Sequence, residues 1–373
     1  MINLKPAVVL GLYGSNSLNT VRSLGFDNIP VHGIHNNSRF PHALYSKFLS
    51  SFQITHSDEE TLETLVTFAK KYSSPLSIFP IGDKNVFLLN DNISHLKEYF
   101  HIPCLPNMNL RRALEKQEIL KIGVDAGFKV PKSQYLSKDI SDFVFPLLAK
   151  PLDSEVAGKK DFYYFDSLNQ YTSKKQELLD RYGEMVIQEF IPGGPDSLYE
   201  VHGYLSSRGP IVGGMLQKEN VLEVKPGVLG SGSLARSVWI PGLIDPSLML
   251  LSNLKFNNAV DINLKRHSQS GEYYFLEINT RTSANLLMDT LFGVNLPATI
   301  YRDQQGMSFK ANDFNYIIDK TYLAEPFALA QDKTLSADSV INLPVDSFAI
   351  YSSQDPVPFL VAKSKNKLNY AHK

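Results

Sequence analysis

The segment V-D-I-N-L at 260–264, which a polar turn connects to Y-Y-F-L-E-I-N-T-R at 273–281, decides the fold of this chain. Apolar and polar residues alternate in both halves, which is typical of half-buried strands paired as a hairpin. The apolar sides are formed by Val260, Ile262 and Leu264 in the first strand and by Tyr274, Leu276 and Ile278 in the second. The other side of the hairpin then carries Asp261, Asn263, Glu277, Asn279 and Arg281.

A divalent cation would explain why two carboxylates share one strand face. With the turn centred near Gln269, Asp261 lies opposite Glu277, and like charges facing each other across two strands repel. Carboxylate and amide oxygens such as that of Asn279 suit Mg²⁺, with Mn²⁺ as the alternative ion. Arg281 could hold a phosphate oxygen beside the metal. From the hairpin alone, a solvated polar face is an equally good interpretation.

The composition indicates a globular protein without an electrostatic signature for nucleic acid. The chain has 373 residues, 43% of them hydrophobic, and 37 basic residues balance 38 acidic ones. Cys104 is the only cysteine, so neither a disulfide framework nor a thiolate metal site is expected. No apolar run is long enough for a membrane span or a signal peptide. We therefore expect a cytoplasmic protein that acts on small molecules.

The first 110 residues predict an alternating α/β domain. A strand at 7–10, a helix at 15–24 and a strand at 30–34 form a βαβ unit. Its glycine turn is G-x-x-G and not the dinucleotide pattern G-x-G-x-x-G, and no acid follows the second strand to bind a ribose. NAD binding is therefore disfavoured.

Residues 111–192 predict a small α+β lobe. A strand at 143–148 ends in Ala-Lys150-Pro, an aromatic strand at 162–165 precedes a helix, and a strand at 185–190 enters the segment I-P-G-G-P-D at 191–196. Residues 311–373 predict short strands and turns, a β-rich appendage.

The order of five motifs resembles the ATP-grasp superfamily, in particular the branch with carbamoyl-phosphate-synthase-like proteins and D-aspartate ligase. The motifs are L-E-K-Q-E-I-L around Lys116, F-P-L-L-A-K-P, V-I-Q-E-F-I-P-G-G-P-D, A-V-D-I-N-L and F-L-E-I-N-T-R. The match covers roughly residues 1–305. The resemblance implies an ATP-grasp fold with a Rossmann-like pre-ATP-grasp domain (1–110), a small lid lobe (111–192), a larger antiparallel-sheet lobe with the metal site (193–310) and the appendage (311–373).

The resemblance also implies roles for individual residues. Lys116 and Lys150 would reach the ATP phosphates, Gln188, Glu189, Phe190 and Ile191 would form the adenine hinge, and Asp196 would hold the ribose. Asp261, Glu277 and Asn279 match the magnesium ligands. Arg281 and, in a looser alignment, Lys218 match the cations of the reaction centre. The segment 153–160, with Lys159 and Lys160, is the candidate lid over the phosphates.

Two departures from the family pattern affect the mechanism. Thr280 replaces the usual proline of E-x-N-P-R, which neither metal nor phosphate binding requires. Ala259 stands where D-alanine–D-alanine ligases have a catalytic arginine, so another group must stabilise the tetrahedral intermediate, and Arg281 is the first candidate.

The function that the resemblance implies is an ATP- and Mg²⁺-dependent carboxylate–amine ligase acting through an acyl phosphate. The alternatives are a phosphotransferase or carboxylase that activates bicarbonate or another small acid, and an ATP-binding module without catalysis. An amino acid, a peptidoglycan precursor and a polysaccharide uronic acid all remain open as substrates. Relatives are often dimers, so a homodimer is one open arrangement.

Overall fold

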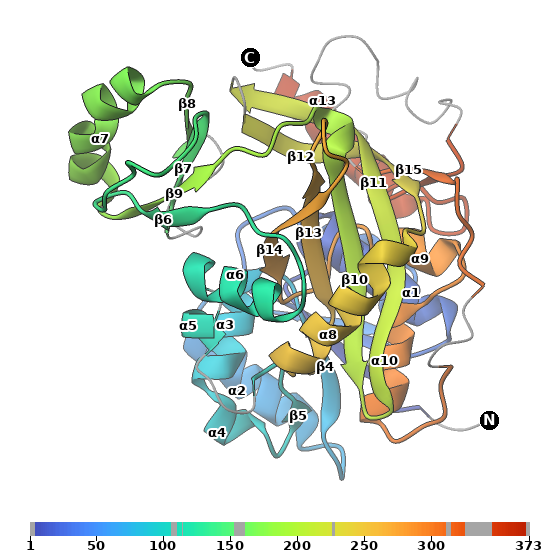
Figure 1. Cartoon of the computed structure of the whole chain (residues 1–373). Coiled ribbons are helices and arrows are strands. Elements are labelled where there is room, and N and C mark those ends of the chain that lie inside the picture. Colours follow the sequence, from blue (N-terminus) through green and yellow to red (C-terminus); the bar gives the residue numbers. More distant parts are fainter. Residues whose placement is uncertain are drawn as a thin grey trace.

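Three sheets organise the chain. The computed structural model describes residues 4–105, 110–113, 115–152, 161–225, 228–310, 315–324 and 345–370. The N-terminal sheet has five parallel strands in the order β3-β2-β1-β4-β5, the small sheet has four in the order β6-β9-β7-β8, and the large sheet has seven in the order β14-β13-β10-β11-β12-β15-β16. In Figure 1 the small sheet projects from the body that the other two sheets form.

The N-terminal domain is a doubly wound α/β unit, as its βαβ pattern predicted. Its strands are β1 (Ala7–Leu10), β2 (Val31–His35), β3 (Ser51–Ile54), β4 (Leu76–Pro80) and β5 (Phe100–His101). Its helices are α1 (Gly14–Phe26), α2 (Asp58–Ala69), α3 (Asp83–Asp91) and α4 (Ile93–Leu96), with a 3₁₀ turn at His42–Tyr45. The strands β1, β2 and β4 are buried throughout, because helices cover both faces of a parallel sheet.

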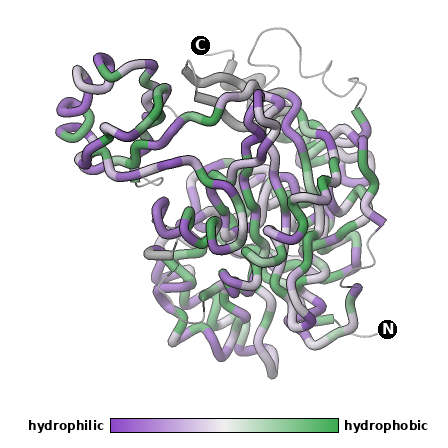
Figure 2. The backbone as a smooth tube through the Cα atoms, viewed as in Figure 1, coloured by the Kyte–Doolittle hydropathy of each residue, from purple (hydrophilic) through white to green (hydrophobic). Residues whose placement is uncertain are grey.

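The small lobe has its own apolar core. It contains β6 (Ser133–Tyr135), β7 (Leu147–Pro151), β8 (Tyr163–Phe165), α7 (Leu168–Tyr182) and β9 (Met185–Glu189), and it follows α5 (Leu110–Ala113) and α6 (Lys116–Asp125). In α7 only Tyr171 and Leu178 are buried, and the helix is largely hydrophilic in Figure 2. One thin layer of side chains therefore joins α7 to the small sheet.

The large sheet is antiparallel except at its last pair, and helices cover both of its faces. Its strands are β10 (Leu198–Ser206), β11 (Gly209–Lys225), β12 (Val228–Ser237), β13 (Val260–Arg266), β14 (Tyr273–Asn279), β15 (Thr321–Leu323) and β16 (Ser347–Phe348). Helices α8 (Ile244–Leu254) and α6 pack on the face that carries Val201 and Ile262. Helices α9 (Leu286–Leu291) and α10 (Leu296–Gln304) join the large sheet to the N-terminal domain. Short 3₁₀ turns lie at Pro195–Ser197 and Pro241–Leu243.

The hairpin of β13 and β14 forms as predicted, but its register differs by two residues. Asp261 pairs with Asn279 and not with Glu277, whose partner is Asn263. The turn is centred half a residue later than Gln269, which moves each partner by one residue, and a β-bulge moves it by one more, because Leu264 pairs with Phe275 and Leu276 is the extra residue of β14. Beyond the bulge the faces exchange, so Phe275 is fully buried, whereas Tyr274 and Leu276, which were predicted on the apolar side, are half-buried.

Residues 315–324 and 345–370 are the described part of the C-terminal segment. There, strands β15 and β16 extend the large sheet, and the longest element is helix α13 (Val357–Tyr370), which the prediction of a β-rich appendage did not include. Asp355, just before this helix, forms an ion pair with Arg22 of α1, and both side chains are buried. Apart from a short apolar start, the sequence of α13 is polar, which hid the helix from a search for apolar periodicity.

No helix among the described residues is long and apolar enough to cross a membrane.

Candidate active site

A pocket lies between the small sheet and the large sheet. The small lobe contributes β7, β9 and the segment that follows β9, and the large sheet contributes β10, β11, β13 and β14. The lining residues are Leu148, Lys150, Phe162, Gln188, Glu189, Phe190, Ile191, Leu198, Lys218, Asn263, Leu264, Lys265, Leu276 and Glu277. Seven polar residues from both lobes thus meet in one cleft with apolar walls.

Two predicted lysines approach the end of β7. Lys150 belongs to β7, and its Nζ donates to Oε1 of Gln188 on the paired strand β9 at 2.6 Å. Lys116 begins α6, and its ammonium donates to the backbone carbonyl of Pro151, the next residue after Lys150. The antiparallel pairing of β7 and β9 therefore brings the Lys150 ammonium to Gln188 of the predicted hinge, whereas Lys116 lies at the end of β7 that pairs with Met185.

The hinge residues Gln188, Glu189, Phe190 and Ile191 all line the pocket. The backbone N–H of Glu189 donates to Lys132 and that of Phe190 to Pro146, both at 2.9 Å, so these two donors are used within the small lobe. The Glu189 side chain turns away and accepts from the Val144 N–H at 3.0 Å. What the hinge presents to the pocket is thus backbone, together with the Phe190 ring.

Lys265 is a pocket residue that the sequence analysis missed. Its Nζ lies 4.1 Å from the centroid of the Phe190 ring. Burial and the nearby Lys150 ammonium lower the pKa of Lys265 to about 8. Strand β13 alternates, and Lys265 follows Asp261 and Asn263 on its polar side at the end of the strand, so nothing in the pattern distinguished it from a solvated lysine.

Of the predicted nucleotide contacts among the described residues, Lys116 and Asp196 do not line the pocket. Asp196 is exposed in the 3₁₀ turn before β10, where the Gln217 side chain donates to its backbone carbonyl at 2.7 Å. Lys159, Lys160 and the rest of the predicted lid at 153–160 lie outside the described residues.

The polar face of the hairpin continues into a third strand. Asp261 pairs with Asn279 on one side and with His202 of β10 on the other. In the next row, Asn263 pairs with Glu277 and with Glu200. Because directly paired residues point to the same face of a sheet, six polar side chains form two rows across β14, β13 and β10.

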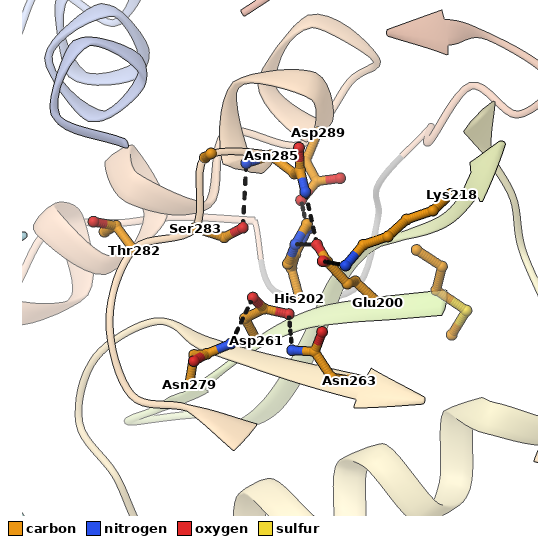
Figure 3. A network of polar contacts seen from close by, with 12 residues as sticks. Glu200, His202, Lys218, Asp261, Asn263, Asn279, Thr282, Ser283, Asn285 and Asp289 are labelled. Atoms are coloured by element: carbon orange, nitrogen blue, oxygen red, sulfur yellow. Dashed lines mark hydrogen bonds and ion pairs between the residues drawn. The ribbon is translucent and has the colours of Figure 1, made fainter. Parts of the chain in front are cut away.

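The residues of these rows fit a divalent cation with oxygen ligands. Asp261 accepts hydrogen bonds of 3.2 Å from the amides of Asn263 and Asn279, as Figure 3 shows. Burial and the Glu200 carboxylate raise the pKa of Asp261 to about 6. A cation would relieve this unfavourable burial of charge. Glu277, which is exposed and lines the pocket, lies in the neighbouring row and would be a further ligand of that cation.

Lys218 connects this polar face to the pocket. Its Nζ lies 2.5 Å from Oε1 of Glu200, and its side chain is 12% exposed. The Asn285 amide donates to the other Glu200 oxygen at 2.7 Å. Although burial opposes ionisation, the ammonium holds the pKa of Glu200 below its usual range, and Glu200 raises that of Lys218. Both groups are therefore charged.

His202 is held by a second carboxylate. Its Nδ1 lies 2.5 Å from Oδ2 of Asp289, and both side chains are fully buried. Burial lowers the pKa of His202, but Asp289 and Glu200 outweigh it and raise that pKa well above its usual value. Tyr316 donates to the other oxygen of Asp289 at 3.2 Å, which fixes this carboxylate in place.

Arg281 is paired with the N-terminal domain. Its Nε lies 3.1 Å from Oδ1 of Asp83 in α3, and its Nη2 donates to the Asn279 side chain at 3.4 Å. The predicted phosphate contact therefore competes with an ion pair. Ala259, the position of the catalytic arginine in D-alanine–D-alanine ligases, is buried in the apolar core, and the positive charges that act on Asp261 in the described chain come from His202, Lys218 and Arg281.

The sequence analysis missed Glu200, His202 and Asp289. The first two alternate in the segment L-Y-E-V-H-G at 198–203, the same pattern that identified Asp261 and Asn263. That signal was available. Asp289, in contrast, lies in the helix α9, and only the tertiary fold brings it to His202.

Comparisons with known proteins agree with the architecture. No family model matches the chain. A curated D-aspartate ligase from Enterococcus faecium (strain Aus0004) is 20% identical over 283 residues, which are 70% of this chain and 67% of the relative. Biotin carboxylase from Campylobacter jejuni superimposes with a TM-score of 0.64 at 14% identity, over 84% of this chain and 74% of that one. L-amino acid ligase from Bacillus licheniformis gives 0.58 at 11% identity, over 80% and 74%.

Proposed function

Because this chain has the fold of the ATP-grasp enzymes, we propose that it is an ATP-dependent carboxylate–amine ligase. One observation carries the proposal: a single pocket holds Lys150, the hinge 188–191 and Glu277, and it adjoins the buried Asp261. Phosphoryl transfer requires mainly that charges are neutralised and reactants aligned, and this cleft offers both.

ATP would bind between the two lobes. Lys116 and Lys150 would hold its phosphates, and the hinge would hold adenine through the Glu189 carbonyl, the Ile191 N–H and the Phe190 ring. Lys265 would neutralise further phosphate charge. The predicted roles of Asp196 at the ribose and of Lys159 and Lys160 in a lid stay part of this proposal.

Asp261, Glu277 and Asn279 would hold Mg²⁺, or Mn²⁺ in its place. The ion would neutralise the phosphate oxygens during transfer. Asn279 would have to rotate its amide, since it now donates to Asp261 and a metal needs its oxygen.

The reaction would proceed in two steps at Lys218 and Arg281. A carboxylate oxygen of the first substrate attacks the γ-phosphorus of ATP, and ADP leaves. The amine nitrogen of the second substrate then attacks the acyl carbon, and phosphate leaves as the amide forms. Lys218 would orient the carboxylate, and Arg281, released from Asp83, would stabilise the oxyanion in place of the arginine missing at Ala259.

A phosphate-release assay with a substrate panel tests the proposal. The panel pairs free amino acids, uronic acids and peptidoglycan precursors as carboxylates with amino acids as amines, each alone and together with Mg²⁺ and ATP. ADP release that requires both substrates supports the ligase. ADP release with bicarbonate alone would indicate a carboxylase or phosphotransferase, and nucleotide binding without turnover would indicate a binding module.

Two glutamates of the same hairpin provide matched variants. Glu277→Gln should abolish turnover, whereas Glu272→Gln, in the turn where Glu272 pairs with Lys129, should not. Full activity in Glu277→Gln would refute the metal assignment. Because the reaction needs ATP, we expect it in the cytoplasm. Light scattering would determine whether the chain is a monomer or a homodimer.

A further inference from the structure

One nitrogen of the buried His202 ring has no hydrogen-bond partner among the described residues. Since Asp289 Oδ2 is a carboxylate oxygen 2.5 Å from Nδ1, Nδ1 must be the donor in that contact. In the neutral ring this leaves a lone pair on Nε2. That atom is buried and without a hydrogen bond, and it faces Oε2 of Glu200 at 3.5 Å, too far for a good hydrogen bond. A buried imidazole nitrogen in this state needs an explanation.

Nε2 points into a group of potential metal ligands. One nitrogen of His202 and one oxygen each of Glu200 and Asp261 lie within 4.8 Å of one another, and all three residues are buried. Ligands about 2.0–2.2 Å from a common ion are roughly 3–4 Å apart, so small side-chain rotations would complete such a site. The strand register explains the grouping, since His202 is paired with Asp261 and lies two residues from Glu200.

The surroundings of His202 match the usual support of a metal-bound histidine. Such a histidine donates its other N–H to a carboxylate, which fixes the tautomer and the ring orientation. Asp289 provides this carboxylate, and Gly214, paired with His202 on β11, provides its space: a Cβ at Gly214 would lie 2.0 Å from Asp289 Oδ1. The absence of a side chain at Gly214 therefore leaves the space that the Asp289 carboxylate occupies.

The charges of the cluster also favour a cation. Three buried carboxylates, Glu200, Asp261 and Asp289, face the Lys218 ammonium and the His202 ring, which leaves an excess of one negative charge with a proton on Nε2 and of two when a metal ion takes the place of that proton. Arg281 is engaged with Asp83. One divalent ion would balance the excess, and buried charge without compensation is strongly unfavourable.

We propose that Glu200, His202 and Asp261 form a binding site for a divalent cation of the Zn²⁺ or Co²⁺ class, which lies next to the proposed Mg²⁺ position at Glu277 and Asn279 and shares Asp261 with it. The imidazole selects for this class, because Mg²⁺ prefers oxygen ligands only. Three protein ligands leave a coordination position open for water or a substrate oxygen. The site is complete without nucleotide, so it does not depend on the proposed ligase activity.

Cobalt binding to the nucleotide-free chain tests this proposal. The full chain is stripped with a chelator and titrated with Co²⁺, and the visible absorption and the paramagnetically shifted imidazole N–H proton are recorded. We expect one Co²⁺ per chain and one shifted N–H signal, that of Nδ1–H on His202. No binding, or binding without the shifted proton, would overturn the proposal and leave a proton as the occupant of Nε2.

Three variants locate the ion. His202→Gln should lower Co²⁺ affinity at least ~10-fold and remove the shifted proton, and Asp289→Asn should lower affinity ~10–100-fold. Glu277→Gln should bind Co²⁺ within ~3-fold of wild type while losing Mg²⁺-dependent turnover, so failure of this site and failure of the ligase proposal are distinguishable. Equal losses in Glu277→Gln and His202→Gln would place the ion at the Mg²⁺ position and refute the proposed site. Circular dichroism checks that each variant folds. If His202→Gln does not fold, the Co²⁺ affinities of Asp289→Asn and Glu200→Gln still test the proposed site.

Discussion

Replacing Gly214 by alanine should displace the Asp289 carboxylate from His202. The new Cβ would lie 2.0 Å from Asp289 Oδ1 and 2.4 Å from its Cγ, against a normal contact of about 3.5 Å. The carboxylate must therefore move by roughly 1.5 Å, which breaks the 2.5 Å contact with Nδ1. Tyr316 and the packed helix α9 leave it little room to move.

The expected cost follows from two effects. Overpacking a core position lowers the free energy of unfolding by about 1–3 kcal/mol. Removing one partner of a buried ion pair lowers it by about 3–5 kcal/mol, and displacing the partner, as here, should cause only part of that loss. We expect a net loss of about 2–4 kcal/mol for Gly214→Ala. Every ~1.4 kcal/mol is tenfold, so the unfolding equilibrium should shift by roughly 30- to 1,000-fold.

The neighbouring Gly213 provides the control. A Cβ there would meet Leu296 Cδ1 at 3.3 Å, a contact that a small rotation relieves, and Gly213 lies in the same strand. Both variants gain the same small amount from lower flexibility of the unfolded chain, so their difference isolates the clash. Urea unfolding followed by circular dichroism measures both. If Gly214→Ala is as stable as Gly213→Ala, the argument from the Asp289 contact is wrong.

Three further perturbations follow from other buried groups. Asp355→Ala should cost about 3–5 kcal/mol in urea unfolding, because it leaves the guanidinium of Arg22 buried without its carboxylate; a loss below ~1 kcal/mol would contradict this. Burial lowers the pKa of His32 to about 4, so between pH 4 and 6.5 the unfolded chain binds a proton that the folded chain does not. The free energy of unfolding should therefore fall by roughly 1–3 kcal/mol as the pH falls through this window. In His32→Asn the free energy of unfolding should depend less steeply on pH. Lys265→Met should stabilise the nucleotide-free chain by about 1–2 kcal/mol, because it removes a partly buried charge. The same substitution should weaken ATP binding measured by calorimetry. Unchanged ATP affinity would exclude Lys265 from the phosphate site.

The period-two pattern of the hairpin was sufficient to predict the two strands and the face on which their polar residues lie. It could not give the register, because the bulge at Leu276 depends on how Phe275 enters the core beside Phe128. A bulge exchanges the faces beyond it, and no local propensity marks it. The prediction that Asp261 faces Glu277 was therefore wrong, although both residues remain in adjacent rows.

The residues of the candidate site also differ in whether the sequence could predict them. The pocket contains Lys150, Glu277 and Lys218, three residues that the resemblance to the ATP-grasp superfamily singled out, and their roles stay predictions. Asp289 could not be found, since a contact between α9 and β10 spans 87 residues of sequence and depends on the space at Gly214. The ion pair of Arg281 with Asp83 likewise joins two domains that the sequence treats separately.

The two polar rows lie on strands of the large sheet, at its β14 edge, and not on its loops. Their spacing from strand to strand is set by the backbone ladder, about 4.8 Å, which substitutions in the connecting segments do not alter. Loops can change length and composition over generations without moving these side chains. A lineage with this fold could therefore exchange one acceptor molecule for another by remodelling its surface segments, while the ion chemistry is inherited unchanged.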